Sequence, residues 1–577
     1  MSEHGYWDRI LNGRLSRRRA IAATGAFTAS AAFLAACGGD DDDDGSGGGT
    51  TGGTTGGAGS PTTGSGSAPA GAGEPKAGGV FRTDMIAEDP ASYDVHQAAS
   101  FGISEEFTLA YNQLVKFSEK ELGKVESDLA TSWEQPDNLT LTFKLVEAKF
   151  HDGTPFTSAD VKATIDRVKN PPEGVTSVRK QWFEPVTSVE TPDDRTVVIK
   201  TSRPSAFMFT GFGSHNIGIY AAKDIADPEF HLKNENGTGP YILDQVNQGS
   251  LYRFRKNPEY FVEGRPYLDA VEFNIIPEAV ARFASWRAKN LDMYSPQATD
   301  VAEIGGISDA TYIKTGGTAY WVMSVPTWIE PWNDERLWKA LALSVNKDDF
   351  NQAQFLGTSS HGGPMPPGSE WALTEEELLQ VPGYKGIGDG QESDMEARWA
   401  EARKLYSAAN FDLGQERGLF SWDTASFSVW CEVILDGLRN AGLENVKLTL
   451  TDRGTYDERL TNRDYGDIAG NSRSAVIPDP TPVFADSYIE GAGRHYSGLV
   501  IPEVEDLFVK QEAELDYNKR FEIQNELQRV FVSKWPLDIS VFTVTNEAIW
   551  NYVKDYGPIY SSMYQGRKYE NLWLDQA

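Results

Sequence analysis

The feature that most limits what this chain can fold into is a stretch after Cys37 with almost no side chains to bury. Asp40 to Asp44 begin it, and Gly, Thr, Ser and Ala fill it as far as Pro75. Such a composition cannot offset the entropy lost on ordering, so we expect residues 37–77 to be a flexible coil with a reach of about 30 to 35 Å. The chain therefore consists of a leader, a linker and a folded body of about five hundred residues.

The leader, residues 1–36, has the pattern of an export signal. Arg17 and Arg18 follow a Ser, and an Ala-rich apolar run follows that is too short for a membrane-spanning helix. The paired arginines resemble a twin-arginine signal, and Leu34-Ala35-Ala36-Cys37 resembles the lipoprotein cleavage site at which the Cys is acylated. The alternatives are an ordinary signal peptide with an incidental Cys and export by the general route.

Charge and cysteine content exclude several classes of protein. The formal net charge is -31, which disfavours nucleic acid as a partner because that binding needs basic surface. The two cysteines are Cys37 and Cys431, so lipidation of Cys37 leaves no intrachain disulfide. Cys431 lies in an apolar stretch and is expected to be a buried small hydrophobe.

Motifs for catalysis, phosphate binding or metal binding are missing from the sequence. It contains no G-x-S-x-G turn, no Walker loop, no H-E-x-x-H and no Cys pair for zinc. His215 and His231 are too isolated to indicate a metal site. We therefore expect a protein that is not an enzyme and that has no cofactor.

The folded body mixes short strands with amphipathic helices. Residues 139–145 and 195–200 alternate in period two after turn residues and are expected to be edge strands of hairpins. The spacing of apolar residues predicts helices over residues 158–168, 395–409, 426–440 and 519–534. Gly442 ends the third of these, and a strand over residues 446–450 follows, which indicates a crossover in a mixed sheet.

Several short strings follow one another in order along this body. They begin at Leu129 (LATSWE), Leu139 (LTLTFKL), Phe150 (FHDGTPFTSADV), Gly237 (GTGPY), Arg255 (RKNPEY), Arg336 (RLWKAL) and Ala402 (ARKL). Taken together, they resemble the dipeptide, oligopeptide and nickel class of bacterial solute-binding proteins, family 5, which serve ABC importers. Read physically, the third string is a tight Asp-Gly turn followed by a capped helix, so it is structural.

The resemblance implies an α/β fold: a two-lobed clamp of the periplasmic-binding-protein type II, with an additional small α+β domain. The ligand is enclosed when the lobes close. The family layout assigns residues 78–114, 236–325 and 535–577 to lobe one, 115–235 to the small domain and 326–534 to lobe two.

The resemblance also implies where a ligand binds, and here the chain departs from the family pattern. Peptide-binding members place an Asp shortly before an Asp/Glu-Pro pair, and alignment on Asp479-Pro480 puts Val476 or Ile477 at that position. An apolar residue cannot hold a desolvated ammonium group. Arg473, next to Ser474, is expected to attract a carboxylate, phosphate or hydroxyl group, with Arg453 as a second charge.

Asp479 itself is a candidate substitute for the missing Asp, provided that it shifts toward the ligand. The tryptophans near the expected cleft have two interpretations, as ligand contacts or as core residues. Trp321 and Trp422 are as consistent with stacking on a ligand as with the core, whereas Trp338 and Trp430 fall on apolar helix faces and are expected in the core. Phe101 and His96 follow the first strand in a loop that the family turns toward the ligand, and a lone His of this kind is expected to be structural.

These observations lead to one functional hypothesis with two alternatives. We expect a monomeric, lipid-anchored receptor. It captures a peptide or other small organic solute outside the cytoplasm and delivers it to the permease of an ABC transporter. Its partners are the solute, the permease and the membrane through the lipid. The alternatives are an oligosaccharide receptor of the same class and a secreted hydrolase.

Overall fold

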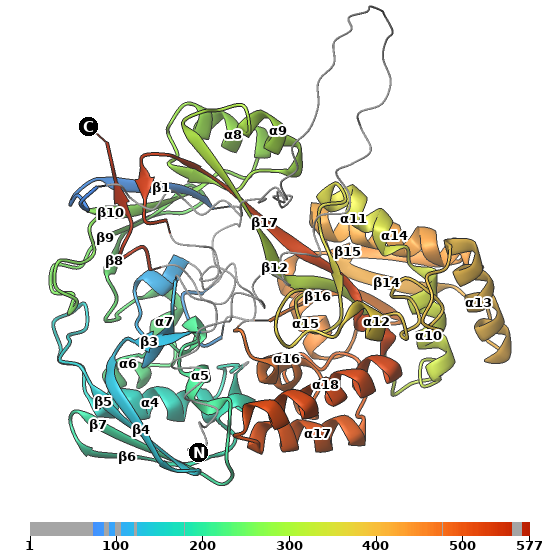
Figure 1. Ribbon diagram of the computed structural model, residues 1–577, viewed down its shortest axis with the longest axis horizontal. Helices are drawn as coiled ribbons and strands as arrows, with labels where there is room; N and C mark the ends of the chain where they lie inside the picture. The colour runs from blue at the N-terminus through green and yellow to red at the C-terminus, as the bar shows by residue number, and fades with distance from the viewer. Residues whose placement is uncertain are drawn as a thin grey trace, which may run out of the picture.

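The computed structural model describes residues 73–85, 92–97, 106–119, 124–177, 179–475, 477–556 and 568–576. Figure 1 shows two bodies, on the left and right of the view, joined by the long strands β12 (Ala310–Ser324) and β17 (Ser540–Trp550). A smaller sheet lies at the lower left. This is the α/β clamp with an additional small domain that the resemblance implies. The residue boundaries of the three parts stay a prediction.

The first lobe is built on a four-stranded sheet in the order β1-β10-β9-β8. The strands are β1 (Val80–Met85), β10 (Ala270–Ile275), β9 (Leu251–Lys256) and β8 (Tyr241–Asn247). Strand β1 is parallel to β10, and the other pairs are antiparallel. Alternate side chains such as Tyr252 and Phe254 point into one apolar core, as period-two patterns require.

The small domain is a second four-stranded sheet, in the order β4-β5-β7-β6, covered by helix α4 (Ser158–Lys169). Its strands are β4 (Ala130–Asp137), β5 (Thr140–Leu145), β7 (Thr196–Thr201) and β6 (Val186–Asp193). The two predicted strands are confirmed as β5 and β7, but the expectation that they are edge strands is wrong. They pair with each other at the centre of the sheet, and their alternation reflects one exposed face.

The string that begins at Phe150 has the structural role expected of it. Gly153 has a φ of +86° in the turn, a conformation that a side chain disfavours. Helix α4 then starts with a capping box, in which Asp160 Oδ2 accepts from the backbone N–H of Thr157 (2.8 Å). The His151 imidazole bonds Glu235 and, at 3.0 Å, the carbonyl of Gly239, so the turn is tied to the first lobe.

The second lobe is built on a mixed sheet in the order β11-β17-β12-β16-β14-β15, and β13 pairs with β17. Strands β11, β12 and β17 of this sheet fall in the ranges that the family layout assigns to lobe one, so the sheet is shared between the two parts. The strands not yet given are β11 (Met293–Tyr294), β13 (His361–Gly362), β14 (Arg417–Trp422), β15 (Val446–Thr451) and β16 (Ile468–Ser474). Strand β14 is parallel to both β15 and β16, whereas β12 is antiparallel to β16. The predicted helix and strand are confirmed as α14 (Ala425–Asn440) and β15, in the mixed sheet that the sequence indicates.

Helices cover both faces of this sheet (Figure 1). They are α10 (Glu335–Ser344), α11 (Lys347–Phe355), α12 (Glu375–Leu378), α13 (Met395–Ala408), α14 (Ala425–Asn440), α15 (Arg453–Thr461), α16 (Pro480–Ser487), α17 (Pro502–Ala513) and α18 (Tyr517–Lys534). The predicted helices over 395–409 and 519–534 are confirmed as α13 and α18. Side chains cap several starts: the Thr424 hydroxyl, for example, accepts from Phe427 N at the start of α14.

Short elements complete the described chain. The short helices are α5 (Met208–Gly211), α6 (Ala222–Ile225), α7 (Phe230–Lys233), α8 (Ala279–Arg287) and α9 (Val301–Ile304). The short strands are β2 (Val115–Phe117), β3 (Val125–Ser127), β18 (Val553–Lys554) and β19 (Trp573–Leu574). The 3-10 turns are η2 (Glu106–Leu109), η3 (Lys180–Phe183), η4 (His215–Ile217), η5 (Ala298–Asp300) and η6 (Pro536–Asp538).

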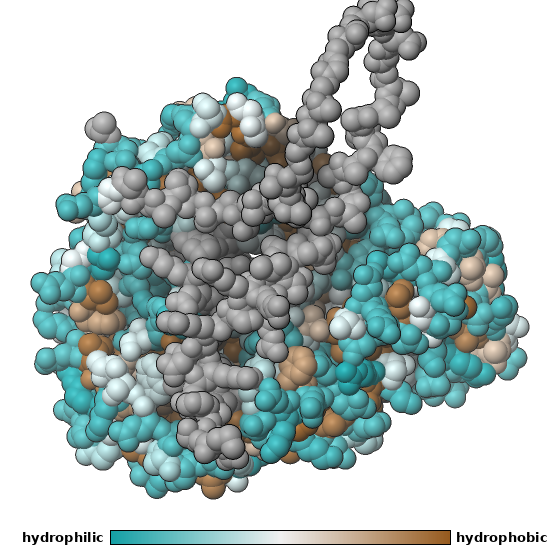
Figure 2. All heavy atoms as spheres, viewed as in Figure 1, coloured by the Kyte–Doolittle hydropathy of each residue, from teal (hydrophilic) through white to brown (hydrophobic). Residues whose placement is uncertain are grey.

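The apolar core is divided between the lobes. One cluster of buried side chains fills the first lobe, and another runs from the small domain into the second lobe. Trp338 and Trp430, 7% and 1% exposed, are in the core as expected. Cys431 is fully buried, and burial raises the pKa of its thiol to about 12, which confirms it as an inert small side chain. Polar residues cover most of the visible face in Figure 2.

Candidate functional site

The carboxyl ends of β14, β15 and β16 form one edge of the second-lobe sheet, near the centre of the molecule in Figure 1. Strands β14 and β16 pair at Leu419 with Ile468 and at Phe420 with Ala469. Beyond these residues the Ser421 hydroxyl donates to Gly470 O (2.8 Å). In open α/β sheets, ligands bind in the crevice at such carboxyl ends. This edge is therefore the candidate site.

Trp422 and Arg453 meet at this edge. Trp422 is the last residue of β14, and Arg453 is the first of α15, directly after β15. The Arg453 guanidinium lies 4.5 Å from the centroid of the half-buried Trp422 ring, and it pairs with Asp457 one helical turn on. The Tyr456 ring stacks beneath Trp422 at 6.3 Å. The pair offers a flat aromatic surface and an accessible positive charge, since 36% of the Arg453 side chain is exposed.

Ser474 ends β16 at the same edge. Its hydroxyl is half-buried and lies 3.2 Å from that of Thr318 on the neighbouring strand β12. A hydroxyl in this position is able both to donate to and to accept from a polar ligand group.

Trp321 lies inside the second lobe and not at the edge. It is 8% exposed and packs on Phe350, Phe355 and Phe427, with ring centroids 5.1 to 6.3 Å apart. Its Nε1 has no acceptor in the part of the chain described. Of the two interpretations of this residue, the packing favours the core.

Arg473 is buried on the opposite face of the sheet from Trp321. It is 3% exposed, its Nη1 donates to Asn471 Oδ1 (2.9 Å), and its guanidinium lies 4.7 Å from the Tyr496 ring centroid. Burial by itself lowers the pKa of Arg473. The nearby Tyr488 and Asp538 raise this pKa by more than burial lowers it, so the pKa lies above its usual value. The guanidinium is therefore permanently charged.

Asp479 is held by other side chains. Its Oδ1 accepts from the backbone N–H of Thr481 (2.9 Å) at the start of α16, and both carboxylate oxygens accept from Arg520 at 2.7 and 2.8 Å. The residue is 3% exposed. A carboxylate engaged in this way serves the helix and the ion pair, so the geometry does not favour Asp479 as a ligand contact.

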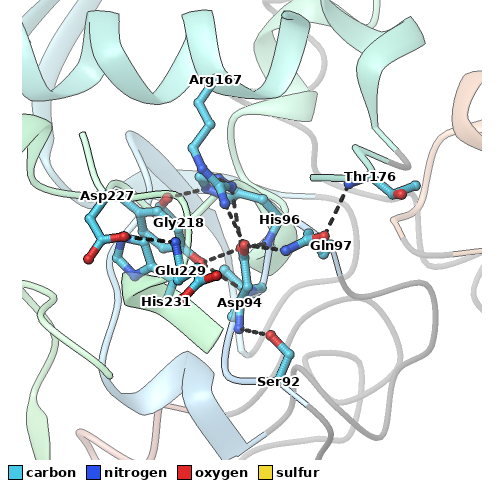
Figure 3. A network of polar contacts seen from close by, with 12 residues as sticks. Ser92, Asp94, His96, Gln97, Arg167, Thr176, Gly218, Asp227, Glu229 and His231 are labelled. Carbon is cyan, nitrogen blue, oxygen red and sulfur yellow. Dashed lines mark hydrogen bonds and ion pairs between the residues drawn. The ribbon is translucent and has the colours of Figure 1, made fainter. Parts of the chain in front are cut away.

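His96 belongs to a buried polar network (Figure 3). Arg167 Nη1 lies 2.9 Å from His96 Nδ1, and His96 Nε2 lies 2.8 Å from Gly218 O. Because a guanidinium only donates, Nδ1 accepts and the proton is on Nε2. Burial and the Arg167 charge lower the pKa of His96 to about 4, so the ring is neutral and structural, as expected.

The other predicted functional residues lie outside the described residues. These are Phe101, the lipidation residue Cys37 and the export residues Arg17 and Arg18. Among the residues that the structure describes, no group of three or more side chains is arranged to hold a metal ion, and no helix is long and apolar enough to cross a membrane.

The structure brings to the site residues that the sequence analysis did not single out. They are Tyr456 beneath Trp422, and Arg494 and Tyr496 from the loop after α16, which contact the end of β16. No local pattern in the sequence marks Arg494 or Tyr496, because their relevance depends on a contact with a strand some twenty residues earlier.

Comparisons with known proteins agree with this architecture. Residues 124–493 match the family model described as bacterial extracellular solute-binding proteins, family 5 middle. Proteins of Brucella ovis and Brucella abortus named as ABC transporter peptide-binding proteins are 30% identical over 258 residues, which is 43% of this chain and 48% of theirs. The match thus spans about half the length of those relatives. The dipeptide-binding protein of Escherichia coli is 26% identical over 77% of this chain and 86% of its own.

Solved structures share the fold. The PBP AgaA of A. tumefaciens R10, in complex with agropinic acid, has a TM-score of 0.74 at 23% identity over 86% of this chain and 99% of its own. The periplasmic binding protein DppA of Helicobacter pylori, in complex with the peptide STSA, also has a TM-score of 0.74, at 20% identity over 87% of this chain and 99% of its own. The family match covers more than half of the chain, and the sheet order, the small domain and the strings that begin at Leu129 agree with it. The chain therefore belongs to the bacterial extracellular solute-binding proteins of family 5.

Proposed function

We propose that this protein is the substrate-binding lipoprotein of an ABC transporter, which captures a peptide or other small organic solute outside the cytoplasm and delivers it to the permease. Closure of the lobes buries the solute, and the permease recognises the closed form, so the transport rate follows the closed population. Capture needs no bond to form or break.

The observation that carries the proposal is the edge at the carboxyl ends of β14 and β16. It presents the half-buried Trp422 ring, the partly exposed Arg453 guanidinium and the Ser474 hydroxyl. An aromatic surface with a few polar groups is typical of small-molecule sites. The E. coli relative named as a dipeptide-binding protein supports a peptide or peptide-like solute.

The first experiment is native mass spectrometry of the protein without its leader, purified without refolding. We expect a small molecule to leave with the protein, and its mass identifies the solute class. A solute that is hydrolysed during hours of incubation with the protein contradicts a role in capture alone and supports an enzyme.

The role of the edge is tested with Trp422→Ala against the solute so identified. Loss of the ring is expected to weaken binding about tenfold or more without lowering the melting temperature by more than a few degrees. Trp430→Phe is the control, because Trp430 is in the core. An unchanged affinity in Trp422→Ala contradicts the placement of the solute at this edge.

Anchoring and export are tested in cells. A lipid on Cys37, with two or more acyl chains, holds a protein firmly to a membrane. We expect Cys37→Ser to release the protein from the membrane fraction and Arg17→Lys with Arg18→Lys to stop export. Normal export of the double variant indicates the general route. Delivery is tested by uptake of the solute in cells that lack the protein.

A further inference from the structure

Arg473 is a buried positive charge that forms no ion pair with any residue that the structure describes. Among the residues that the structure describes, no carboxylate lies within 4.0 Å of its guanidinium. Its Nε is buried and has no acceptor. A buried charge is normally paired, because removing it from water costs several kcal/mol. Arg417, a comparably buried arginine of the same lobe, does have such a partner, Asp467 at 3.3 Å.

A second guanidinium, that of Arg494, lies beside the first. Its Nη2 donates to Ser472 O (2.9 Å), and Nη1 of Arg473 is 3.4 Å from the same oxygen. Arg494 Nε is also buried without an acceptor. Two positive groups that share one carbonyl oxygen repel each other, and an anion between them relieves that repulsion.

The charges around this pair do not balance. Asp538 interacts electrostatically with Arg473 and Asp486 with Arg494, and Arg179 Nη1 lies 3.3 Å from Asp486 Oδ2. This group of three guanidiniums and two carboxylates carries one net positive charge. Both carboxylates already accept other bonds, since Asp538 accepts from Trp535 Nε1 (2.9 Å) and Tyr488, and Asp486 accepts from Trp182 Nε1 (2.7 Å).

The guanidinium pair lies at the candidate site. Ser472 and Arg473 are among the last three residues of β16, and β14 pairs with β16 only near the start of that strand, at Ile468 and Ala469. Ser472 and Arg494 are half-buried, so the pair reaches the surface. The Tyr496 ring flanks the Arg473 guanidinium at 4.7 Å.

We propose that Arg473 and Arg494 together bind a carboxylate group of the transported solute. This inference rests on the proposed function and adds the chemical class of the solute. A carboxylate carries the single negative charge that balances the excess and accepts in a planar, bidentate manner from guanidinium donors. A phosphate group carries close to two charges and leaves the cluster negative.

The test measures binding of simple anions by calorimetry at constant ionic strength. Acetate and succinate are the carboxylate probes, inorganic phosphate is the competing anion and chloride is the background. The variants are Arg473→Gln and Arg494→Gln, and Arg417→Gln is the matched control because it removes a buried guanidinium that has its own carboxylate.

We expect saturable binding of a carboxylate, weakened at least about 30-fold in Arg473→Gln and in Arg494→Gln and within twofold of the parent in Arg417→Gln. The half-buried Arg494 keeps the test decisive if Arg473→Gln does not fold. Binding of phosphate but not of carboxylates overturns the choice of anion, and unchanged binding in Arg494→Gln overturns the site.

The solute identified by mass spectrometry separates this inference from the proposed function. A co-purified solute with a carboxylate supports both. A solute without any acidic group leaves the proposed function intact and overturns the carboxylate site. Absence of saturable binding for any probe, together with an empty purified protein, counts against both.

Discussion

Replacement of Asp94 by Asn removes the central charge of the network in Figure 3. The Asp94 side chain is fully buried, and its oxygens accept from Arg167 Nη1 (3.3 Å), Tyr220 Oη (3.0 Å) and Gln97 Nε2 (2.8 Å). These bonds join the segment of residues 92–97 to α4 of the small domain. The variant leaves the Arg167 guanidinium, 2% exposed, without a counterion.

Two estimates give the size of the effect. Burial raises the pKa of Asp94, but His96, once it is protonated in acid, and the Arg167 guanidinium lower it by more, to about 2 against an ordinary 3.8. That difference corresponds to about 2.5 kcal/mol of stability at neutral pH. Removal of one partner of a buried ion pair costs about 3 to 5 kcal/mol, because the other charge remains buried and unpaired. We therefore expect a loss of about 3 kcal/mol or more.

Hydrogen exchange followed by mass spectrometry is the assay, because a chain of this size does not unfold in a single step. Peptides that cover residues 92–97 and 214–220 are expected to exchange at least about 100-fold faster in Asp94→Asn, since 1.4 kcal/mol is a factor of ten. Asp244→Asn is the control: its pair with Arg253 (2.9 Å) is about 30% exposed on both sides and is worth at most about 1 kcal/mol.

A double variant tests whether the unpaired Arg167 guanidinium causes the loss of stability. If the cost comes from the orphaned guanidinium, Asp94→Leu combined with Arg167→Met is expected to recover most of the lost protection, because a well-packed apolar pair has no charge to leave unpaired. Exchange in Asp94→Asn within fivefold of the parent refutes the argument, as does a double variant that is less protected than Asp94→Asn.

Two more predictions concern acid and the contact between the small domain and the second lobe. Burial lowers the pKa of His96 to about 4 and that of His231 to about 3. Because both folded values lie below the unfolded value near 6.5, the stability from the neutral rings is complete above pH 6.5 and falls as the pH drops toward 4. The melting temperature is expected to fall over that range, less steeply in His96→Gln, and a flat profile contradicts the neutral rings. Arg203 Nη2 lies 2.7 Å from Glu512 Oε2 across the contact, and Arg203→Gln is expected to shift the ligand-free protein toward open forms by about fivefold. Small-angle X-ray scattering measures the shift, with Arg253→Gln as the control of equal exposure (28% and 30%); equal scattering of the two variants contradicts it.

Much of the fold follows from short stretches of sequence. The period-two stretch 139–145, the capped helix that starts at Ser158 and the helix before Gly442 are all present within one or two residues of their predicted limits. Their signals are local, since a strand pattern, a capping box or a terminal glycine involves residues only a few positions apart. The order of the sequence strings that begin at Leu129 also indicated the family.

The local sequence does not determine which strands pair with each other. The sequence predicts that 139–145 and 195–200 are strands, yet their place at the centre of the sheet depends on the pairing of β5 with β7, whose paired residues lie 52 to 60 positions apart in the chain. A half-exposed face and an exposed edge give the same alternation of side chains.

The candidate site shows the same limit. The sequence determines that Arg473, Asp479 and two tryptophans occur near the expected cleft, and it supplies their charge and size. Only the tertiary structure decides their roles: Arg520, 41 residues away, engages Asp479, three phenylalanines enclose Trp321, and Arg494 joins Arg473 at a shared carbonyl oxygen. A charge acts according to its counterion and its exposure to water, and both are set by segments that are distant in the chain.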